Sequence, residues 1–161
     1  MKDGGAHAIK LEGGSSVLSQ VELLASAGVP VIGHLGLTPQ SVNLIGGYRV
    51  QGRGEQGQIL LQDAKSLQAA GAAAIVLEAV PAELAAKVTD MLSIPTIGIG
   101  AGAATDAQVL VWQDMLGLTA GPVPRFVRQY ADLRTIMSDA VHAWTQDVAS
   151  GAFPAGDQSY A

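Results

Sequence analysis

The sequence predicts an α/β fold built on parallel strands, and three observations lead to this prediction. Segments with the spacing of amphipathic helices alternate along the chain with short apolar runs. One pattern, a helix end followed by a brief turn and a nearly continuous apolar strand, repeats in ASAGVPVIGH, QAAGAAAIVLE and DMLSIPTIGIG. Continuous apolar runs suit parallel strands covered on both faces, and their alternation with helices is typical of βαβ units.

The expected elements follow one another in a regular order. Apolar runs predict strands over residues 6–12, 29–35, 72–78 and 94–100. Amphipathic segments predict helices over residues 17–28, 58–71, 81–92 and 131–149. The first two helices close on Gly28 and Gly71, and the third begins with Pro81, which suits a first helical turn. We expect either a short helix or a buried irregular segment over residues 106–116.

A long glycine-rich and polar stretch over residues 36–57 follows the second predicted strand. Connections beyond about 12–15 residues without structure of their own are uncommon and often functional. Thr38 followed by Pro39 predicts a short helix there, because threonine caps helix starts and proline suits the first helical position. His34 lies where the strand enters this stretch, so a substrate contact and a purely structural role are both open for it.

The composition limits the possible classes of protein. The chain has 161 residues, of which 48% are hydrophobic and 14% charged, which is enough for one domain with a core. A formal charge of −5 without a Lys/Arg cluster argues against a nucleic-acid partner. The absence of cysteine excludes disulfides and thiolate metal sites. The sequence shows neither an apolar run of about 18 residues nor a signal-peptide pattern, so we expect a soluble, cytoplasmic protein with no membrane partner.

Polar side chains recur at the carboxyl ends of the predicted strands. Lys10 and Glu12 lie two residues apart, which puts both on one face of a strand, and Glu78 ends the third strand. In parallel α/β folds this edge of the sheet is where ligands bind. We therefore expect these residues and His34 to line one rim, although for each alone a salt bridge is an equally good interpretation.

Glu78 ends an apolar run and has no basic residue near it in the sequence. An apolar setting disfavours the charged form of a carboxyl group and makes the carboxylate a stronger base, which suits general base catalysis. The alternative is an ion pair with an arginine from elsewhere, for which Arg49 and Arg53 are candidates. Asp63 and Asp90, in contrast, are expected on solvated helix faces.

The glycine-rich stretch GIGAGAAT, residues 98–105, partly fits the pattern of dinucleotide-binding turns. That pattern also needs an acidic residue about 20 positions further on, at the end of a second strand. The chain reads LTAGPVP over residues 118–124 and has no acidic residue there. We therefore expect the glycines to allow a tight turn or a close approach of the backbone to a ligand.

Five motifs occur in the order and spacing of one enzyme family: IKLEGG, GHLGLTPQSVN…GGYRVQGR, LLQDAKSLQAAGAAAIVLEAVP, IPTIGIGAG and TDAQVLVWQDMLG. Together with PRFVRQYADL, they resemble ketopantoate hydroxymethyltransferase (3-methyl-2-oxobutanoate hydroxymethyltransferase) from about residue 3 to the end of the chain. Such long compound motifs are highly specific. Ala107 departs from the glycine usual in this family, which concerns local backbone geometry more than chemistry.

The resemblance implies a (β/α)₈ TIM barrel of the phosphoenolpyruvate/pyruvate superfamily, usually assembled as a decamer. This chain would hold roughly its last half, with barrel units over residues 1–130 and a C-terminal helix and tail over 131–161. The implied reaction transfers a hydroxymethyl group from 5,10-methylenetetrahydrofolate to 3-methyl-2-oxobutanoate, giving 2-dehydropantoate in pantothenate biosynthesis. A Mg²⁺ ion is implied as well, which would hold the keto acid and stabilise its enolate.

The resemblance also implies roles for individual residues. Lys10 falls on the lysine that pairs with the substrate carboxylate, and Glu12 falls on a metal ligand. Glu78 falls on the proton acceptor, and His34 falls on a histidine that contacts the substrate.

The family has a further N-terminal portion, with the first barrel strands and two metal-site aspartates, one followed by a serine, to which no residues here correspond. We therefore expect this chain alone to bind metal very weakly and to show no turnover. Two alternatives stay open. Besides the hydroxymethyltransferase, the chain could be an inactive barrel half that acts only by association with a partner chain, or another Mg²⁺-dependent C–C bond enzyme of the same superfamily.

Overall fold

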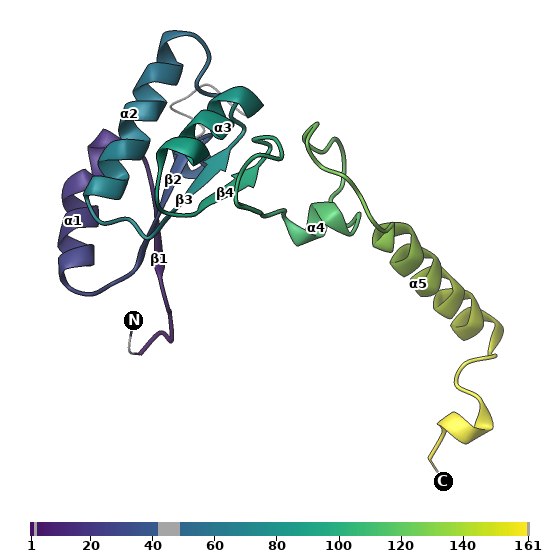
Figure 1. Cartoon of the computed structure of the whole chain (residues 1–161). Helices are drawn as coiled ribbons and strands as arrows, with labels where there is room; N and C mark the ends of the chain where they lie inside the picture. The colour runs from purple at the N-terminus through teal and green to yellow at the C-terminus, as the bar shows by residue number, and fades with distance from the viewer. Residues whose placement is uncertain (2, 42–48, 161) are drawn as a thin grey trace. The chain divides into compact units, whose positions relative to one another are not determined.

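The computed structural model describes residues 1, 3–41 and 49–160 of the chain. These residues form two compact units, Met1–Val109 and Leu110–Ala161, and each is described by itself (Figure 1). Residues 42–48, which belong to the long stretch after the second predicted strand, lie outside the described residues. The division into barrel units up to residue 130 and a C-terminal helix with its tail stays a prediction.

The first unit is built around one parallel sheet, as the sequence predicts. Its strands keep the order of the chain, and each pairs in parallel with the next. The strands are β1 (Ile9–Glu12), β2 (Val31–Gly36), β3 (Ala74–Glu78), β4 (Thr96–Ile99) and β5 (Ala107–Gln108). The helices between the first four strands are α1 (Leu18–Ser26), α2 (Glu55–Ala69) and α3 (Ala82–Met91). The predicted α/β class with a parallel sheet is confirmed.

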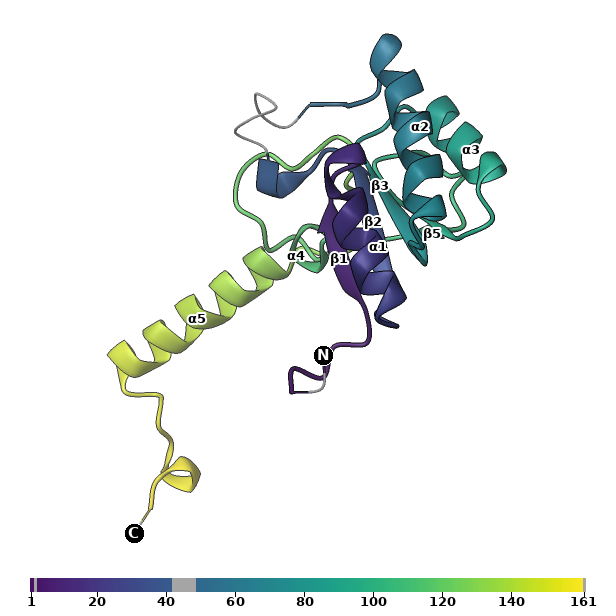
Figure 2. The ribbon, with the colours of Figure 1, turned by 90° about the vertical axis from the view of Figure 1, so that its left-hand side faces the viewer.

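These helices lie along the same face of the sheet (Figures 1 and 2). Parallel crossover connections are right-handed in nearly all proteins, so a sheet that keeps the chain order receives its connecting helices on one side. Buried side chains of the helices and strands meet there in a single core, which includes Val21, Leu67, Ile75, Leu77 and Val88. A doubly wound sheet differs, because its strand order reverses and its helices cover both faces.

The opposite face of the sheet, here called the second face, carries the histidine and the charged side chains of the strands. Leu35 and Leu77 belong to the core under the helices. Side chains alternate along a strand, so the neighbouring residues His34 and Glu78 point to the second face. Glu12 lies opposite His34 in the strand register and points the same way. The histidine and the two carboxylates thus lie on the face of the sheet away from the helix-covered apolar core.

Two elements, β1 and α2, begin three residues away from their predicted starts, and the other boundaries differ by at most two residues. β1 begins at Ile9 instead of residue 6, because β2 begins directly opposite it and gives earlier residues no partner. α2 begins at Glu55 instead of residue 58, and Gly57 in its first turn hides this start, since glycine is a poor helix former. The predicted helix stops are confirmed: Gly28 and Gly71 have positive φ angles of 77° and 95°.

The segment over residues 106–116 is only partly as predicted. A short helix, α4 (Trp112–Met115), is present, but Ala107 and Gln108 form the strand β5, and their side chains are exposed instead of buried. A strand this short leaves no alternation for a sequence pattern to detect. The structure also contains short 3₁₀ helices, of which η2 begins at Pro39 as predicted: η1 (Ser15–Val17), η2 (Pro39–Ser41) and η3 (Gly156–Gln158).

A cluster of hydrogen bonds fixes the start of β4. The carboxylate of Asp106 accepts hydrogen bonds from the backbone N–H of Thr96, at 2.8 Å, and from its hydroxyl, at 2.9 Å. The Thr96 hydroxyl also lies 2.8 Å from that of Thr89 on α3. The two Thr96 donors hold the pKa of Asp106 below its usual value, because they stabilise the charged carboxylate.

We expect this cluster to make the free energy of unfolding depend on pH. A carboxyl group whose pKa is lowered by folding stabilises the fold above its unfolded pKa of about 4, and the contribution is lost as the pH falls through the lowered pKa. The destabilisation by Asp106→Asn, measured by urea unfolding, is therefore expected to be larger near pH 6 than near pH 2.5. The same destabilisation at both pH values would show that the charge plays no part.

The second unit contains α4 and the longer helix α5 (Leu133–Ser150). Asp132 caps α5 by accepting a hydrogen bond from the backbone N–H of Thr135 at 3.3 Å, and Gly151 follows its end with a φ of 77°. The helix predicted over residues 131–149 is thus confirmed. Every helix in the described ranges is too short or too polar to cross a membrane.

Candidate functional site

The carboxyl edge of the sheet collects polar side chains from three strands. Glu12 is the last residue of β1 and Glu78 the last residue of β3, while His34 lies in β2 directly opposite Glu12. Lys10 lies two residues before Glu12 in β1 and points to the same face. The strands are parallel, so their carboxyl ends meet at one edge. The structure brings together the four residues that the sequence singles out.

A continuous series of contacts links these four side chains. His34 Nε2 lies 3.2 Å from Glu78 Oε2, and His34 Nδ1 lies 3.8 Å from Glu12 Oε1. Lys10 Nζ lies 3.8 Å from the same Glu12 oxygen. Half of the Lys10 side chain is exposed (49%), whereas the other three are largely buried. The cluster is therefore a buried histidine between two carboxylates, with an ammonium group at its solvent side.

His34 is the most buried member of the cluster, with 1% of its surface exposed. Neither of its ring nitrogens has a hydrogen-bond partner among the described residues, because the contact with Glu78 lacks hydrogen-bond geometry. A buried polar atom without a partner costs about 1–3 kcal/mol, and in native proteins it calls for an explanation. A histidine placed to contact a ligand at this rim is one such explanation.

The Glu12 carboxylate is held by the turn after β2. Its Oε2 accepts a hydrogen bond from the backbone N–H of Gln40, in η2, at 3.0 Å. Its Oε1 faces Lys10 and His34. A fixed carboxylate with one oxygen free of hydrogen bonds suits a single ligand to Mg²⁺, which prefers oxygen donors. No group of three or more His, Cys, Asp or Glu residues that could hold a metal occurs in the described part of the chain.

Glu78 has a different partner from the arginines considered as alternatives. Its carboxylate contacts His34, and neither Arg49 nor Arg53 lies within 4 Å of it among the described residues. The backbone turns sharply directly after Glu78, because the next residue, Ala79, has a positive φ of 49°. Ala79 is also buried. A non-glycine residue in this region stores roughly 1–3 kcal/mol of strain, and such strain concentrates at functional sites.

The glycine-rich stretch over residues 98–105, which begins inside β4, packs closely on itself and on α3. A Cβ atom at Gly98 would lie 2.5 Å from the hydroxyl oxygen of Thr105, and one at Gly102 would lie 2.5 Å from Cβ of Ala82. Neither distance is possible for a real Cβ atom. The glycines of this stretch therefore allow a tight turn, which is one of the two roles expected from the sequence.

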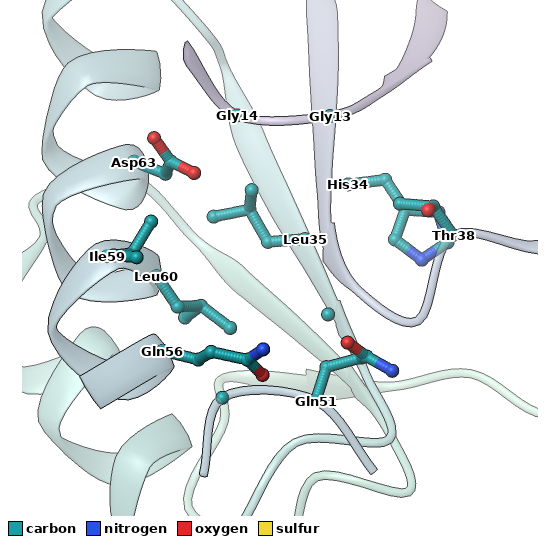
Figure 3. A pocket seen from close by; sticks show the side chains of 12 residues that line it. Gly13, Gly14, His34, Leu35, Thr38, Gln51, Gln56, Ile59, Leu60 and Asp63 are labelled. Atoms are coloured by element: carbon teal, nitrogen blue, oxygen red, sulfur yellow. The ribbon is translucent and has the colours of Figure 1, made fainter. Parts of the chain in front are cut away.

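A cavity of about 350 Å³ adjoins the cluster, between the end of β2 and the first turns of α2 (Figure 3). Of the four clustered residues, His34 is the one that lines it within the described structure. Gly13, Thr38 and Asp63 are further lining residues. The cavity thus reaches the rim at His34 and extends toward α2.

The expectation that Asp63 lies on a solvated helix face is only partly right. Its side chain is half-buried, and its Oδ1 accepts a hydrogen bond from the backbone N–H of Ser15 at 3.0 Å. The backbone N–H of Gln40 is the other contributor that sequence reasoning missed. No sequence signal identifies either, because one contact joins residues 48 positions apart and the other uses a backbone group. Asp90 is exposed, as predicted.

Comparisons with known proteins identify the relatives of this chain. The sequence profile of the ketopantoate hydroxymethyltransferase family matches residues 1–156. The 3-methyl-2-oxobutanoate hydroxymethyltransferase of Frankia casuarinae is 64% identical over 160 residues, which are 99% of this chain and 54% of that protein. The proteins of the same name from Streptomyces coelicolor and Thermobifida fusca are 62% and 57% identical, and the matches cover 55% and 58% of their lengths.

The chain spans about half the length of the curated relatives it matches. The family match, however, covers nearly the whole chain, from residue 1 to residue 156. The identities are far above the level at which relatives share a fold. The chain therefore belongs to the ketopantoate hydroxymethyltransferase family.

Proposed function

We propose that the protein containing this chain transfers a hydroxymethyl group from 5,10-methylenetetrahydrofolate to 3-methyl-2-oxobutanoate, giving 2-dehydropantoate for pantothenate biosynthesis. Family membership supports the reaction. The observation that carries the proposal is the contact series of Glu12, His34 and Glu78 at the carboxyl edge of the sheet. A reaction at a carbon next to a keto group needs a base and polar groups around the developing enolate, and this edge supplies both.

Glu78 is the proposed base that removes the proton from C3 of the keto acid. Its Oε2 faces His34 at 3.2 Å, which leaves Oε1 to accept the proton. The side chain is 15% exposed, so little water competes for it. His34 is buried beside it and is the proposed substrate contact, which its ring nitrogens support because they have no hydrogen-bond partners in the described structure. These groups provide proton transfer and positioning.

Lys10 is the proposed partner of the substrate carboxylate. Its contact with Glu12 is long, at 3.8 Å, and half of its side chain is exposed. Exposed ion pairs of this kind contribute only about 0.2–1 kcal/mol, so the ammonium group can turn to an incoming carboxylate at little cost. Binding there would anchor the keto acid with its reacting carbon toward the buried end of the cluster.

Glu12 is the proposed contribution of this chain to a Mg²⁺ site. The Gln40 N–H holds one carboxylate oxygen, and the other is free to bind the ion. When bound, Mg²⁺ would polarise the keto group and stabilise the enolate. One carboxylate supplies only part of the oxygen ligands that Mg²⁺ requires, so further ligands must come from substrate, water and other residues.

The proposal includes a TIM barrel, of which this chain forms part. Parallel strands in chain order, with the connecting helices on one face, support this architecture, because a barrel winds in one direction. Homo-oligomer formation, a decamer in the family, and a cytoplasmic location are proposed with it. A row of exposed apolar residues along α5 supports association with other chains: Ile136, Met137, Val141, Trp144 and Val148.

We expect the 161-residue chain by itself to bind Mg²⁺ and 3-methyl-2-oxobutanoate very weakly, with a Kd above about 1 mM. The reason is that Glu12 is one ligand where several are needed. Isothermal titration calorimetry with the metal, the keto acid and both together measures this. Tight ternary binding by this chain alone would contradict the proposal that the site needs further residues.

A second candidate function is association without catalysis. Among the described strands β1 pairs on one side only, with β2, and an open parallel edge is a surface to which another strand can add. Sedimentation velocity of the pure chain, together with an activity assay, discriminates between association without catalysis and the proposed hydroxymethyl transfer. A folded monomer that stays monomeric at high concentration would count against this candidate, whereas stable complexes without activity would favour it.

A further inference from the structure

Asp63 connects α2 to the turn that follows β1. Its Oδ1 accepts a hydrogen bond from the backbone N–H of Ser15 at 3.0 Å. Ser15 is the first residue of η1, which runs into α1, so the carboxylate lies at the start of a helical segment where its negative charge is favourable. Figure 3 shows the Asp63 side chain pointing from α2 toward Gly13 and Gly14. The contact joins two elements that are far apart in the sequence.

Gly14 is shaped to receive this carboxylate. A Cβ atom at Gly14 would lie 2.0 Å from an Asp63 carboxylate oxygen and 2.2 Å from its Cγ, so any other residue would displace the side chain. Gly13, which precedes it, has a positive φ of 126°. Two consecutive glycines give the unfolded chain wide conformational freedom. The turn therefore needs contacts from outside to hold one conformation.

Two such contacts hold the turn from opposite sides. The backbone N–H of Gly13 donates to the carbonyl oxygen of His34 at 3.0 Å, which attaches the turn to β2. The Asp63 carboxylate attaches Ser15 to α2. Glu12 lies directly before this turn, and its side chain reaches the backbone N–H of Gln40. The direction of the Glu12 side chain is thus set between a fixed turn and the fixed N–H donor of Gln40.

We propose that Asp63 is a positioning residue, which holds the turn over residues 13–15 and thereby directs the Glu12 carboxylate to the rim. This proposal rests on the proposed function only in one respect, namely that the Glu12 carboxylate serves as a Mg²⁺ ligand. A merely local role would have Asp63 stabilise the start of η1 and α1 without any effect on Glu12. The two roles differ in what happens at Gln40, which contacts Glu12 and not Asp63.

The test follows backbone amides by ¹⁵N NMR in the 161-residue chain, at constant pH and without metal or substrate. In Asp63→Ala we expect hydrogen exchange at Ser15 to rise by about ten-fold or more, since a bond to a charged acceptor is lost. We also expect the Gln40 amide proton to shift toward its position in Glu12→Ala, which removes the acceptor outright. Asp90→Ala, at an exposed aspartate of α3, is the matched control and should change neither amide.

Asp63→Asn keeps an oxygen acceptor at the same place. This variant replaces Asp63→Ala in the test if the alanine variant does not fold. We expect it to retain the Gln40 amide position and most of the protection at Ser15. Faster exchange at Ser15 with an unchanged Gln40 amide in Asp63→Ala would overturn the proposal, as would loss of the Gln40 contact in Asp63→Asn while Ser15 stays protected. Because no metal or substrate is present, a wrong role for Glu12 would leave this result unaffected.

Discussion

Replacement of Glu78 by glutamine is expected to lower the rate of 2-dehydropantoate formation by on the order of 10³-fold, the usual contribution of a positioned general base. The amide keeps the size of the side chain but cannot accept the C3 proton. Its contact with His34 Nε2, at 3.2 Å, can be kept through the amide oxygen. The substrate should therefore still bind, and the loss should appear in kcat rather than in KM.

The assay supplies the portion of the Frankia casuarinae relative that this chain does not match, as a second polypeptide, since the match covers 54% of that protein. Glu83→Gln is the matched control, because Glu83 lies exposed in the first turn of α3 and faces no member of the cluster. We expect this control to keep the unmodified rate. A Glu78→Gln assembly that remains as active as the control would remove Glu78 from the chemistry.

Replacement of Gly36 by alanine is expected to destabilise the fold by about 3–5 kcal/mol, or to prevent folding. Gly36 ends β2 with a positive φ of 93°. An added Cβ would lie 2.2 Å from the backbone oxygen of Glu78 and 2.6 Å from a methyl group of Val80. The backbone oxygen cannot move aside easily, since it accepts a hydrogen bond from Leu37 at 2.8 Å.

Gly28→Ala provides the matched control for this prediction. Gly28 also has a positive φ, of 77°, but a Cβ there would meet nothing within 4 Å. We therefore expect a loss of about 1 kcal/mol from backbone strain alone. Urea unfolding of both variants measures the difference between them. Equal destabilisation by Gly36→Ala and Gly28→Ala would mean that the close approach of Gly36 to the Glu78 backbone does not contribute to the loss of stability.

The strands and most of the helices could be predicted because their signals are local. Apolar runs before a polar residue, as in the segments that end at Glu78 and near His34, give both the strand and the edge at which the polar group lies. Once the strands are parallel and ordered, proximity of these side chains follows from topology. The cluster was therefore accessible from the sequence.

Other parts of the site could not be predicted because they depend on contacts between distant segments. Asp63 looks like an ordinary helix-surface aspartate until the fold places it against Gly14. Gln40 contributes a backbone N–H, which no side-chain pattern reveals. Asp106 acts through Thr96 on a neighbouring strand, and β5 is too short to carry a period. In each case tertiary packing decides the role of the residue.

In the proposed reaction Glu78, within its cluster with His34 and Glu12, removes the C3 proton of the keto acid. The most direct measurement is the exchange of that proton for deuterium, followed by NMR of 3-methyl-2-oxobutanoate in D₂O with Mg²⁺ and without folate. For this chain assembled with the complementary portion of its relative, we predict exchange that falls by on the order of 10³-fold in Glu78→Gln. An assembly that forms 2-dehydropantoate but exchanges equally fast with and without the Glu78 carboxylate would contradict the claim.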